Sequence, residues 1–365
     1  MVETMHYAYQ PDYVVKPGEV LEEMLDTLAI QKNDLAQRCD LSAKTISQII
    51  NGSAPISPET ALCFQKVLNV SASIWNNLEA GYRLSLARIS ALKEFENSVE
   101  WSKNFPLKQL IERGFLEKRQ NPVELVDQLL AFFAVGSVKA WEAQYDMVQV
   151  AFRCSPAFKS SKESVSAWLR TGEICAAKIN CQPFDKQKFL SVLERIRTLT
   201  PKDPDVFEPE MRKLCAEAGV ALVFVAEFPG THLSGATKWM TKDKALLMLS
   251  LRHKRDDYFW FSFFHEAGHI IQGGKKNIFL DEMNGWISPE EDAANKFASE
   301  ILIPEKRYRM FADNQEFTPE AILEFSSDLR IAPGIIVGRL QHDNKIPWQS
   351  LNHLTRRFEL VEACG

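Results

Sequence analysis

The sequence lacks any apolar run of the roughly 18 to 20 residues that a membrane-spanning helix needs. Residues 1–13 also lack a basic segment followed by a hydrophobic one, so we expect a cytoplasmic protein with no membrane partner. The 7 cysteines are scattered and never form a C-x-x-C pair, which argues against a disulfide framework and against a cysteine-type zinc site. We therefore expect reduced thiols that are mostly buried.

An excess of positive charge is missing as well. The chain has 43 Lys and Arg residues against 48 Asp and Glu residues, which gives a net charge of -5. Such a chain has no global attraction for nucleic acid, so any DNA binding must come from a local element. What the sequence does have is length and apolar content, 365 residues of which 45% are hydrophobic. More than one compact domain is therefore expected.

Helical periodicity dominates the first 200 residues, and the pattern changes after two closely spaced prolines, Pro201 and Pro204. Beyond them, residues 219–227 and 245–251 are short apolar runs typical of buried strands. We expect an α+β protein with four parts: an all-α domain in residues 1–85, a helical connecting layer in 86–200, a mixed α and β domain in 201–310, and a helical extension in 311–365.

Residues 31–52 contain a short helix, a tight turn at residues 39–41 and a second helix N-capped by Ser42. This segment resembles the helix-turn-helix of XRE-type repressors, more narrowly of HigA-type antitoxins, although Asp40 stands where that family usually has glycine. The resemblance implies operator DNA as a partner, bound by a homodimer. The residues that the resemblance places at the major groove are Ala43, Lys44, Thr45 and Gln48. Those that it places near phosphates are Gln31, Asn33 and Asn51. The alternative is a purely structural helical bundle, since acidic residues outnumber basic ones in residues 1–85.

Residues 265–269 read His-Glu-Ala-Gly-His, an H-E-x-x-H arrangement. Two histidines four residues apart lie on one face of a helix, so both imidazoles can reach one ion, while Glu266 lies beside them and can hold a water. The aromatic residues just before the motif predict a helix that is buried nearly all round. The alternative is a pair of core histidines satisfied by other polar groups.

Residues 288–304, SPEEDAANKFASEILIP, predict a second helix that follows the motif. Together with HEAGH, this segment resembles the ImmA/IrrE metallopeptidase family, in which a glutamate four residues before the asparagine supplies a third zinc ligand. The resemblance implies that Glu291 is this ligand, beside His265 and His269. From the residues alone, Glu290 is a competitor, and Glu291 could instead be the third-position acid of a capping box.

The resemblance implies a zincin-like fold for the C-terminal domain and a zinc-dependent endopeptidase, with Glu266 as the general base. We expect its substrate to lie beside an edge strand formed by Leu246, Leu247, Met248, Leu249, Ser250 and Leu251. The implied substrate is a helix-turn-helix repressor or antitoxin, cleaved in trans or within the same chain. The alternative function is an antitoxin or transcriptional autoregulator whose zincin-like domain is a sensor or partner-binding module, and a toxin is a further partner that the resemblance allows. The intact Glu266 favours the enzyme, because a structural zinc site needs no base.

Overall fold

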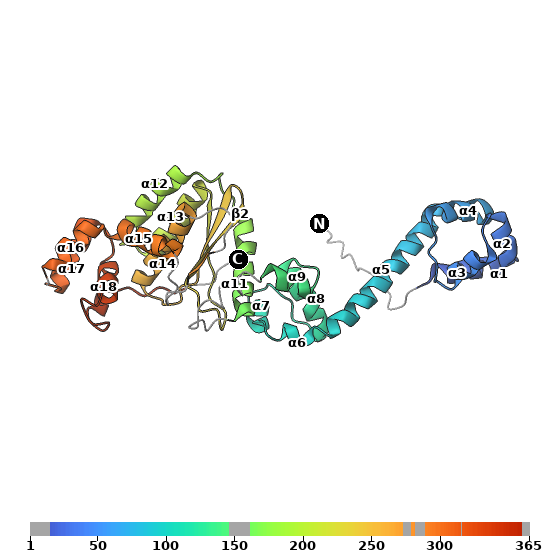
Figure 1. Cartoon of the computed structure of the whole chain (residues 1–365), viewed down its shortest axis with the longest axis horizontal. Coiled ribbons are helices and arrows are strands. Elements are labelled where there is room, and N and C mark those ends of the chain that lie inside the picture. The colour runs from blue at the N-terminus through green and yellow to red at the C-terminus, as the bar shows by residue number, and fades with distance from the viewer. Residues whose placement is uncertain (1–14, 146–160, 273–278, 282–288, 315, 360–365) are drawn as a thin grey trace, which may run out of the picture. The chain divides into compact units, whose positions relative to one another are not determined.

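The computed structural model describes residues 15–145, 161–272, 279–281, 289–314 and 316–359 (Figure 1). The chain divides into two compact units, one that ends at Val99 and one that begins at Glu100. No helix in the described part of the chain is both long enough and apolar enough to cross a membrane.

The N-terminal unit is entirely helical in its described residues, as the sequence predicts. Its helices are α1 (Pro17–Thr27), α2 (Lys32–Arg38), α3 (Ala43–Ile50), α4 (Pro58–Leu68) and α5 (Ala72–Glu96). The hydroxyls of Ser42 and Ser57 accept hydrogen bonds from the first turns of α3 and α4, which fixes where these helices begin. Side chains from all five helices form one core, which includes Leu21, Leu35, Ile46, Phe64 and Trp75.

The second unit is built on a four-stranded sheet of order β1-β3-β2-β4. Its strands are β1 (Val220–Phe224), β2 (Gly235–Thr241), β3 (Lys244–Leu249) and β4 (Phe279–Asp281). Strand β3 pairs with β1 in parallel and with β2 antiparallel, and β2 also pairs antiparallel with β4.

The prediction that residues 246–251 form an edge strand is therefore wrong. Leu246, Leu247, Met248 and Leu249 lie in β3, whose backbone groups bond to a strand on each side. Ser250 and Leu251 follow the strand, and the Ser250 N–H donates to the Ser234 carbonyl. An apolar run indicates that a strand is buried on both faces of its sheet. Because interior strands share this property, the run does not show whether the strand lies at an edge. On the β2 side, the strand at the edge is β4.

Helices cover both faces of the sheet (Figure 1). Before the sheet come α6 (Val99–Ser102), α7 (Leu107–Glu112), α8 (Pro122–Phe133), α9 (Val138–Gln144), α11 (Lys162–Lys178), α12 (Lys186–Arg197) and α13 (Pro204–Glu217). After β3 come α14 (Asp256–Gln272), α15 (Pro289–Leu302), α16 (Glu305–Asp313), α17 (Pro319–Leu329), α18 (Pro333–His342) and a 3₁₀ turn at Asn352–Leu354.

Alternate residues of the strands enter two different cores, as the period of two requires. Val220 and Leu222 of β1 pack with α13 and α14, whereas Ala221 and Val223 pack with α8 and α11. Helices α8 and α11 therefore pack on one face of the sheet, and α12 packs on the other face. Residues 316–359 share the core of α14. The expected finer divisions at 85, 200 and 310 stay predictions beside the two compact units above.

The cysteines are partly as expected. Cys39 and Cys215 are buried free thiols, and burial raises the pKa of Cys39 to about 11. Cys63 and Cys181 are free and half-buried. Cys175, however, is disulfide-bonded. The sequence did not predict this bond, because spacing along the chain does not show which sulfur atoms the fold brings together.

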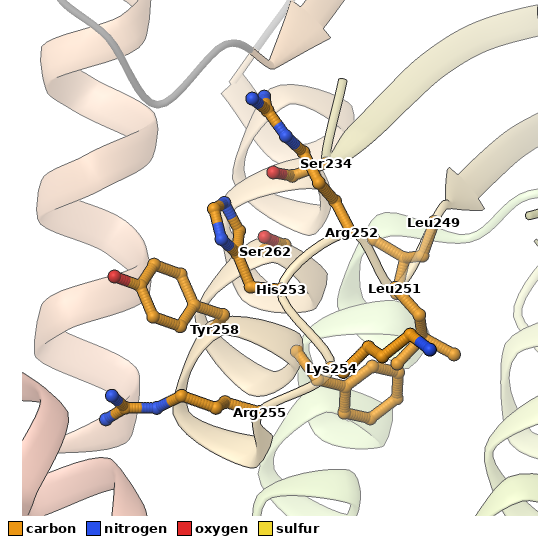
Figure 2. A pocket seen from close by; sticks show the side chains of 10 residues that line it. Ser234, Leu249, Leu251, Arg252, His253, Lys254, Arg255, Tyr258 and Ser262 are labelled. Atoms are coloured by element: carbon orange, nitrogen blue, oxygen red, sulfur yellow. The ribbon is translucent and has the colours of Figure 1, made fainter. Parts of the chain in front are cut away.

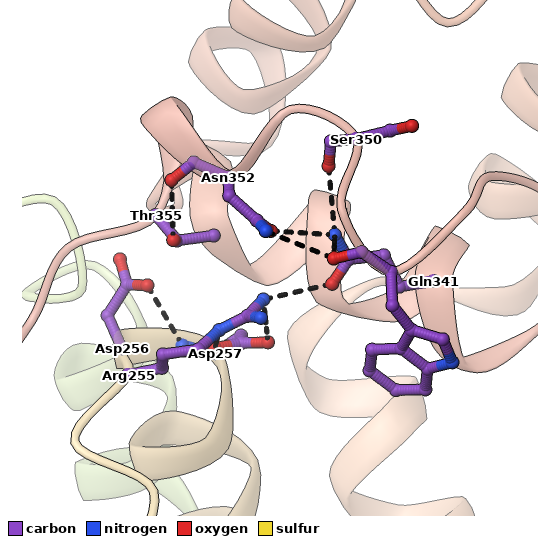
Figure 3. Close-up of polar contacts among 8 residues, drawn as sticks. Arg255, Asp256, Asp257, Gln341, Ser350, Asn352 and Thr355 are labelled. Atoms are coloured by element: carbon purple, nitrogen blue, oxygen red, sulfur yellow. Dashed lines mark hydrogen bonds and ion pairs between the residues drawn. The ribbon is translucent and has the colours of Figure 1, made fainter.

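Helix α14 is anchored at its first turn by two buried carboxylates, Asp256 and Asp257 (Figure 3). Arg255 donates two hydrogen bonds to Asp257, at 3.0 and 2.9 Å, and a third to the Gln341 side chain of α18 at 3.0 Å. Glycines of α18 allow this close approach, since a Cβ on Gly334 would lie 2.4 Å from Asp256 Oδ1. The start of the helix that carries the H-E-x-x-H motif is therefore fixed.

Candidate metal centre and DNA-binding surface

The two histidines of the motif face each other on α14. The Nε2 atoms of His265 and His269 are 3.0 Å apart, and both side chains are almost fully buried. One helical turn separates them, which is the geometry that the four-residue spacing predicts.

Glu291 of α15 completes this cluster. Its Oε2 lies 3.1 Å from His265 Nε2 and its Oε1 lies 3.3 Å from His269 Nε2, with the Glu291 side chain 15% exposed. These three residues offer ligand atoms that all lie within 4.8 Å of one another. Two imidazole nitrogens and a carboxylate are a donor set that suits zinc, so the residues present fit this ion.

Close packing of α15 on α14 brings Glu291 to the histidines. A Cβ on Gly268 would lie 3.2 Å from the Ala294 Cα and 3.2 Å from Phe297, so a larger residue here would require the helices to move apart by a few tenths of an ångström. The glycine inside the HEAGH motif therefore permits the close packing of the ligand helices.

Asn295 orients one of the histidines. Its Oδ1 accepts a hydrogen bond from His265 Nδ1 at 2.9 Å, one turn after Glu291 on α15. When Nδ1 carries the proton, the lone pair of Nε2 points at the cluster, which is the tautomer that a metal ligand needs. In the sequence, Asn295 served only to locate Glu291, the glutamate four residues before it. The same spacing places both side chains on one face of α15.

The electrostatics of Glu291 suit an anionic ligand. Burial would raise the pKa of this carboxyl group, but hydrogen bonds and charge interactions with His265 and His269 outweigh burial and lower it to about 2. Glu291 is therefore ionised at neutral pH. Its competitor Glu290 is exposed, and Ser288, the first residue of the predicted capping box, lies outside the described residues.

Glu266 is fully buried beside the cluster, on the side of α14 that faces β2. An added Cβ on Gly235 would lie 2.6 Å from both Glu266 Cγ and Glu266 Oε1. Only glycine at the start of β2 therefore leaves the Glu266 carboxylate where it is. No spacing rule marks Gly235, because it lies 31 residues before Glu266 in the sequence.

On the N-terminal unit, α3 presents the predicted recognition surface. Ala43, Lys44 and Gln48 are exposed on this helix, while Thr45 is half-buried and its hydroxyl lies 2.8 Å from the Ser42 hydroxyl. The remaining predicted contacts, which are also exposed, are Gln31, Asn33 and Asn51. The exposed face of this part of the unit is thus polar and includes the side chain of a lysine.

The turn between α2 and α3 has the predicted conformation. Asp40 has a φ of 54°, in the left-handed region that favours glycine, and the next N–H, of Leu41, donates to the Ala36 carbonyl at 2.9 Å. Nearby basic side chains are engaged by acids, since Arg38 pairs with Asp34 and Lys32 with Glu22. Lys44 carries the positive charge on α3.

Two family models match the chain. Residues 217–326 match the IrrE N-terminal-like domain, and residues 21–75 match a helix-turn-helix model. An HTH-type transcriptional regulator of Haemophilus influenzae is 36% identical over 83 residues, which cover 22% of this chain and 76% of that protein. The HTH-type transcriptional regulator YddM of Escherichia coli is 29% identical over 72 residues, 20% of this chain and 77% of its own length.

A solved structure, an addiction module antidote protein of the HigA family from Coxiella burnetii, matches 23% of this chain and 92% of its own at 28% identity and a TM-score of 0.21. The curated relatives and the helix-turn-helix model agree with the geometry of the N-terminal unit, and the IrrE N-terminal-like model agrees with that of the second unit. The chain therefore belongs to the XRE-type helix-turn-helix regulators by its N-terminal unit, and it carries an IrrE/ImmA-like peptidase-family domain in its second unit.

Proposed function

We propose that this protein is a DNA-binding regulator whose second unit is a zinc-dependent endopeptidase that cleaves a helix-turn-helix repressor or antitoxin, in trans or in its own chain. The observation that carries the proposal is the convergence of His265, His269 and Glu291 with a buried Glu266 beside them. A zinc site that only stabilised the fold would have four protein ligands and no base, whereas three ligands leave one position open.

His265, His269 and Glu291 would hold the ion, whose Lewis acidity would polarise a peptide carbonyl and make water a stronger acid. Glu266 takes the proton from the attacking water and returns it to the leaving amine. Asn295 keeps the His265 ring in its orientation while this happens. The edge strand β4 pairs with β2 at Gly235, next to Glu266, so we propose that the substrate extends along β4.

DNA binding is proposed to require a homodimer. Beyond Tyr82, α5 carries the large apolar side chains of Leu84, Leu86, Ile89 and Leu92, each at least 38% exposed. A helical segment that buries little of its apolar surface is marginally stable in water, so contact with a second copy would stabilise it. We propose that the protein acts in the cytoplasm, because that is where it would bind its operator.

Incubation of the zinc-loaded protein with helix-turn-helix repressors encoded beside it tests the proposal. Mass spectrometry should show new fragments with the wild-type protein and none with Glu266→Gln at the same zinc content. Intact repressors with both proteins would instead favour the regulator whose zincin-like unit binds a partner without cutting it. The curated relatives, which match only the helix-turn-helix part, leave that second function as the alternative.

A further inference from the structure

A small pocket lies between the loop that follows β3 and the first turns of α14 (Figure 2). Its lining includes Ser262, which lies four residues before Glu266 and therefore on the same face of α14, about 6 Å along the helix axis. Ser234, which also lines it, directly precedes Gly235, the residue that packs against the Glu266 carboxylate. The pocket is thus adjacent to the proposed catalytic base.

The pocket contains a buried hydroxyl that lacks a hydrogen bond. Ser234 is 5% exposed, and its Oγ has no partner within the described parts of the chain. Figure 2 shows this hydroxyl on the same side as the Ser262 hydroxyl and the His253 ring. An unsatisfied buried hydroxyl is costly, so a ligand with an acceptor oxygen at this place would be favoured.

The pocket also contains a cation without an acidic partner. Arg252 is half-buried and donates to the His232 carbonyl, but no carboxylate within the described ranges forms an ion pair with it. Its neighbours differ, since Arg255 is held by Asp257, and Lys254 lies 3.8 Å from Glu359. A half-buried guanidinium attracts a carboxylate, because charge-assisted hydrogen bonds to a planar anion suit its geometry.

The backbone of this loop is held in an unusual conformation. Leu251 and Lys254, which flank Arg252 and His253, have φ values of 57° and 55°, in the left-handed region that residues with a Cβ disfavour. Strain of this kind persists where the surrounding structure enforces it and is found most often at functional sites. The loop therefore holds Arg252 and His253 at the pocket against the preference of its own backbone.

We infer that this pocket recognises the carboxylate of an acidic side chain, Asp or Glu, in the peptide bound next to Glu266. The inference rests on the proposed peptidase function and adds a substrate class to it. Arg252 supplies the charge, and the Ser234 hydroxyl donates to a carboxylate oxygen. Cleavage is thereby directed to bonds that have an acidic residue nearby.

Binding is tested first without catalysis, in the zinc-loaded full-length Glu266→Gln protein. The probes are the end-blocked peptides acetyl-Ala-Glu-Ala-amide and acetyl-Ala-Gln-Ala-amide, compared by saturation-transfer NMR. We expect the glutamate peptide to bind at least about tenfold more tightly, which is the worth of one charge-assisted hydrogen-bond pair. Acetyl-trialanine with a free C-terminus and inorganic phosphate show whether another anion is preferred, and a preference for either one would overturn the inference.

Three variants assign the preference to its residue. Arg252→Met should abolish it at unchanged zinc content, which shows that this variant keeps its fold, and Arg252→Lys should restore part of it. Lys254→Met is the matched control, because it removes the same charge from the same loop but its side chain points away from the Ser262 side of the pocket (Figure 2). Equal loss of preference in Arg252→Met and Lys254→Met would reduce the effect to net charge and overturn the inference.

The cleavage profile of the wild-type protein on a proteome-derived peptide library separates this inference from the proposed function. Cleavage without enrichment of Asp or Glu near the cut bond would overturn the inference and leave the peptidase intact. Absence of cleavage, with a glutamate preference in binding that depends on Arg252, would support the pocket and refute the peptidase.

Discussion

Replacement of Gly235 by alanine should separate catalysis from metal binding. The new Cβ would lie 2.6 Å from Glu266 Cγ and Oε1, and 2.9 Å from Cδ. Carbon and oxygen atoms in ordinary contact are about 3.5 Å apart, so the Glu266 carboxylate must move by about 1 Å. The metal ligands need not move, because none of the atoms nearest to this Cβ belongs to His265, His269 or Glu291.

A displacement of about 1 Å in a catalytic group can lower the rate about a hundredfold. We therefore expect Gly235→Ala to lose about two orders of magnitude in kcat/KM, with zinc content unchanged. The free energy of unfolding should fall by about 1 to 3 kcal/mol, which is typical of overpacking in a core. Cleavage assays, metal analysis and urea denaturation on the same preparation measure the three quantities.

The matched control is Gly136→Ala, in the same unit, where an added Cβ meets nothing within 4 Å. It should leave both activity and zinc content unchanged. Full activity of Gly235→Ala would refute the assigned place of Glu266 in the reaction. Loss of zinc in that variant would show that the added methyl group disturbs the ligands and not the base.

Three further predictions concern the base, the operator and the start of α14. Glu266→Gln should keep its zinc and fold but lose at least about a hundredfold in peptidase activity, the usual contribution of a positioned general base, as steady-state assays will show. Lys44→Ala/Gln48→Ala should abolish the specific complex with the protein's own promoter in a low-salt gel shift, while zinc content stays unchanged; a complex as tight as that of the wild type would refute the recognition surface. Burial raises the pKa of Asp256 to about 6 from 3.8, even with Arg356 at 3.4 Å. The native state therefore binds this proton more tightly than the unfolded state, and stability falls by about 2 kcal/mol as the pH rises from 4 to 7. Urea denaturation should show this loss in the wild type, and the difference from Asp256→Asn should change by that amount between the two pH values; a constant difference would contradict the raised pKa.

Local signals in the sequence predicted much of the fold. The apolar spacing and the Ser42 cap predicted α3, and the hydrogen bond from the Thr45 N–H to the Ser42 hydroxyl confirms its start. Asp40 was expected in a turn that favours glycine, and its φ of 54° agrees. These features depend on residues within a few positions of one another, which is why sequence reasoning reaches them.

Features that depend on distant residues were not predicted. Strand β2 was not identified, since its sequence GATKWMT includes glycine and lysine, and its partners β3 and β4 are needed to recognise it. Without β2, the interior strand β3 was taken for an edge. The supporting roles of Gly235 and Asn295 likewise arise only when β2 and α15 pack on α14.

The metal content of the purified full-length protein tests the claim on which the peptidase depends. We predict about one zinc ion per chain in the wild-type protein, by inductively coupled plasma mass spectrometry. His265→Ala/His269→Ala should contain none, and Glu291→Ala should lose most of it. Stoichiometric zinc in the double variant would contradict the site, and unchanged zinc in Glu291→Ala would show that the third ligand is another residue.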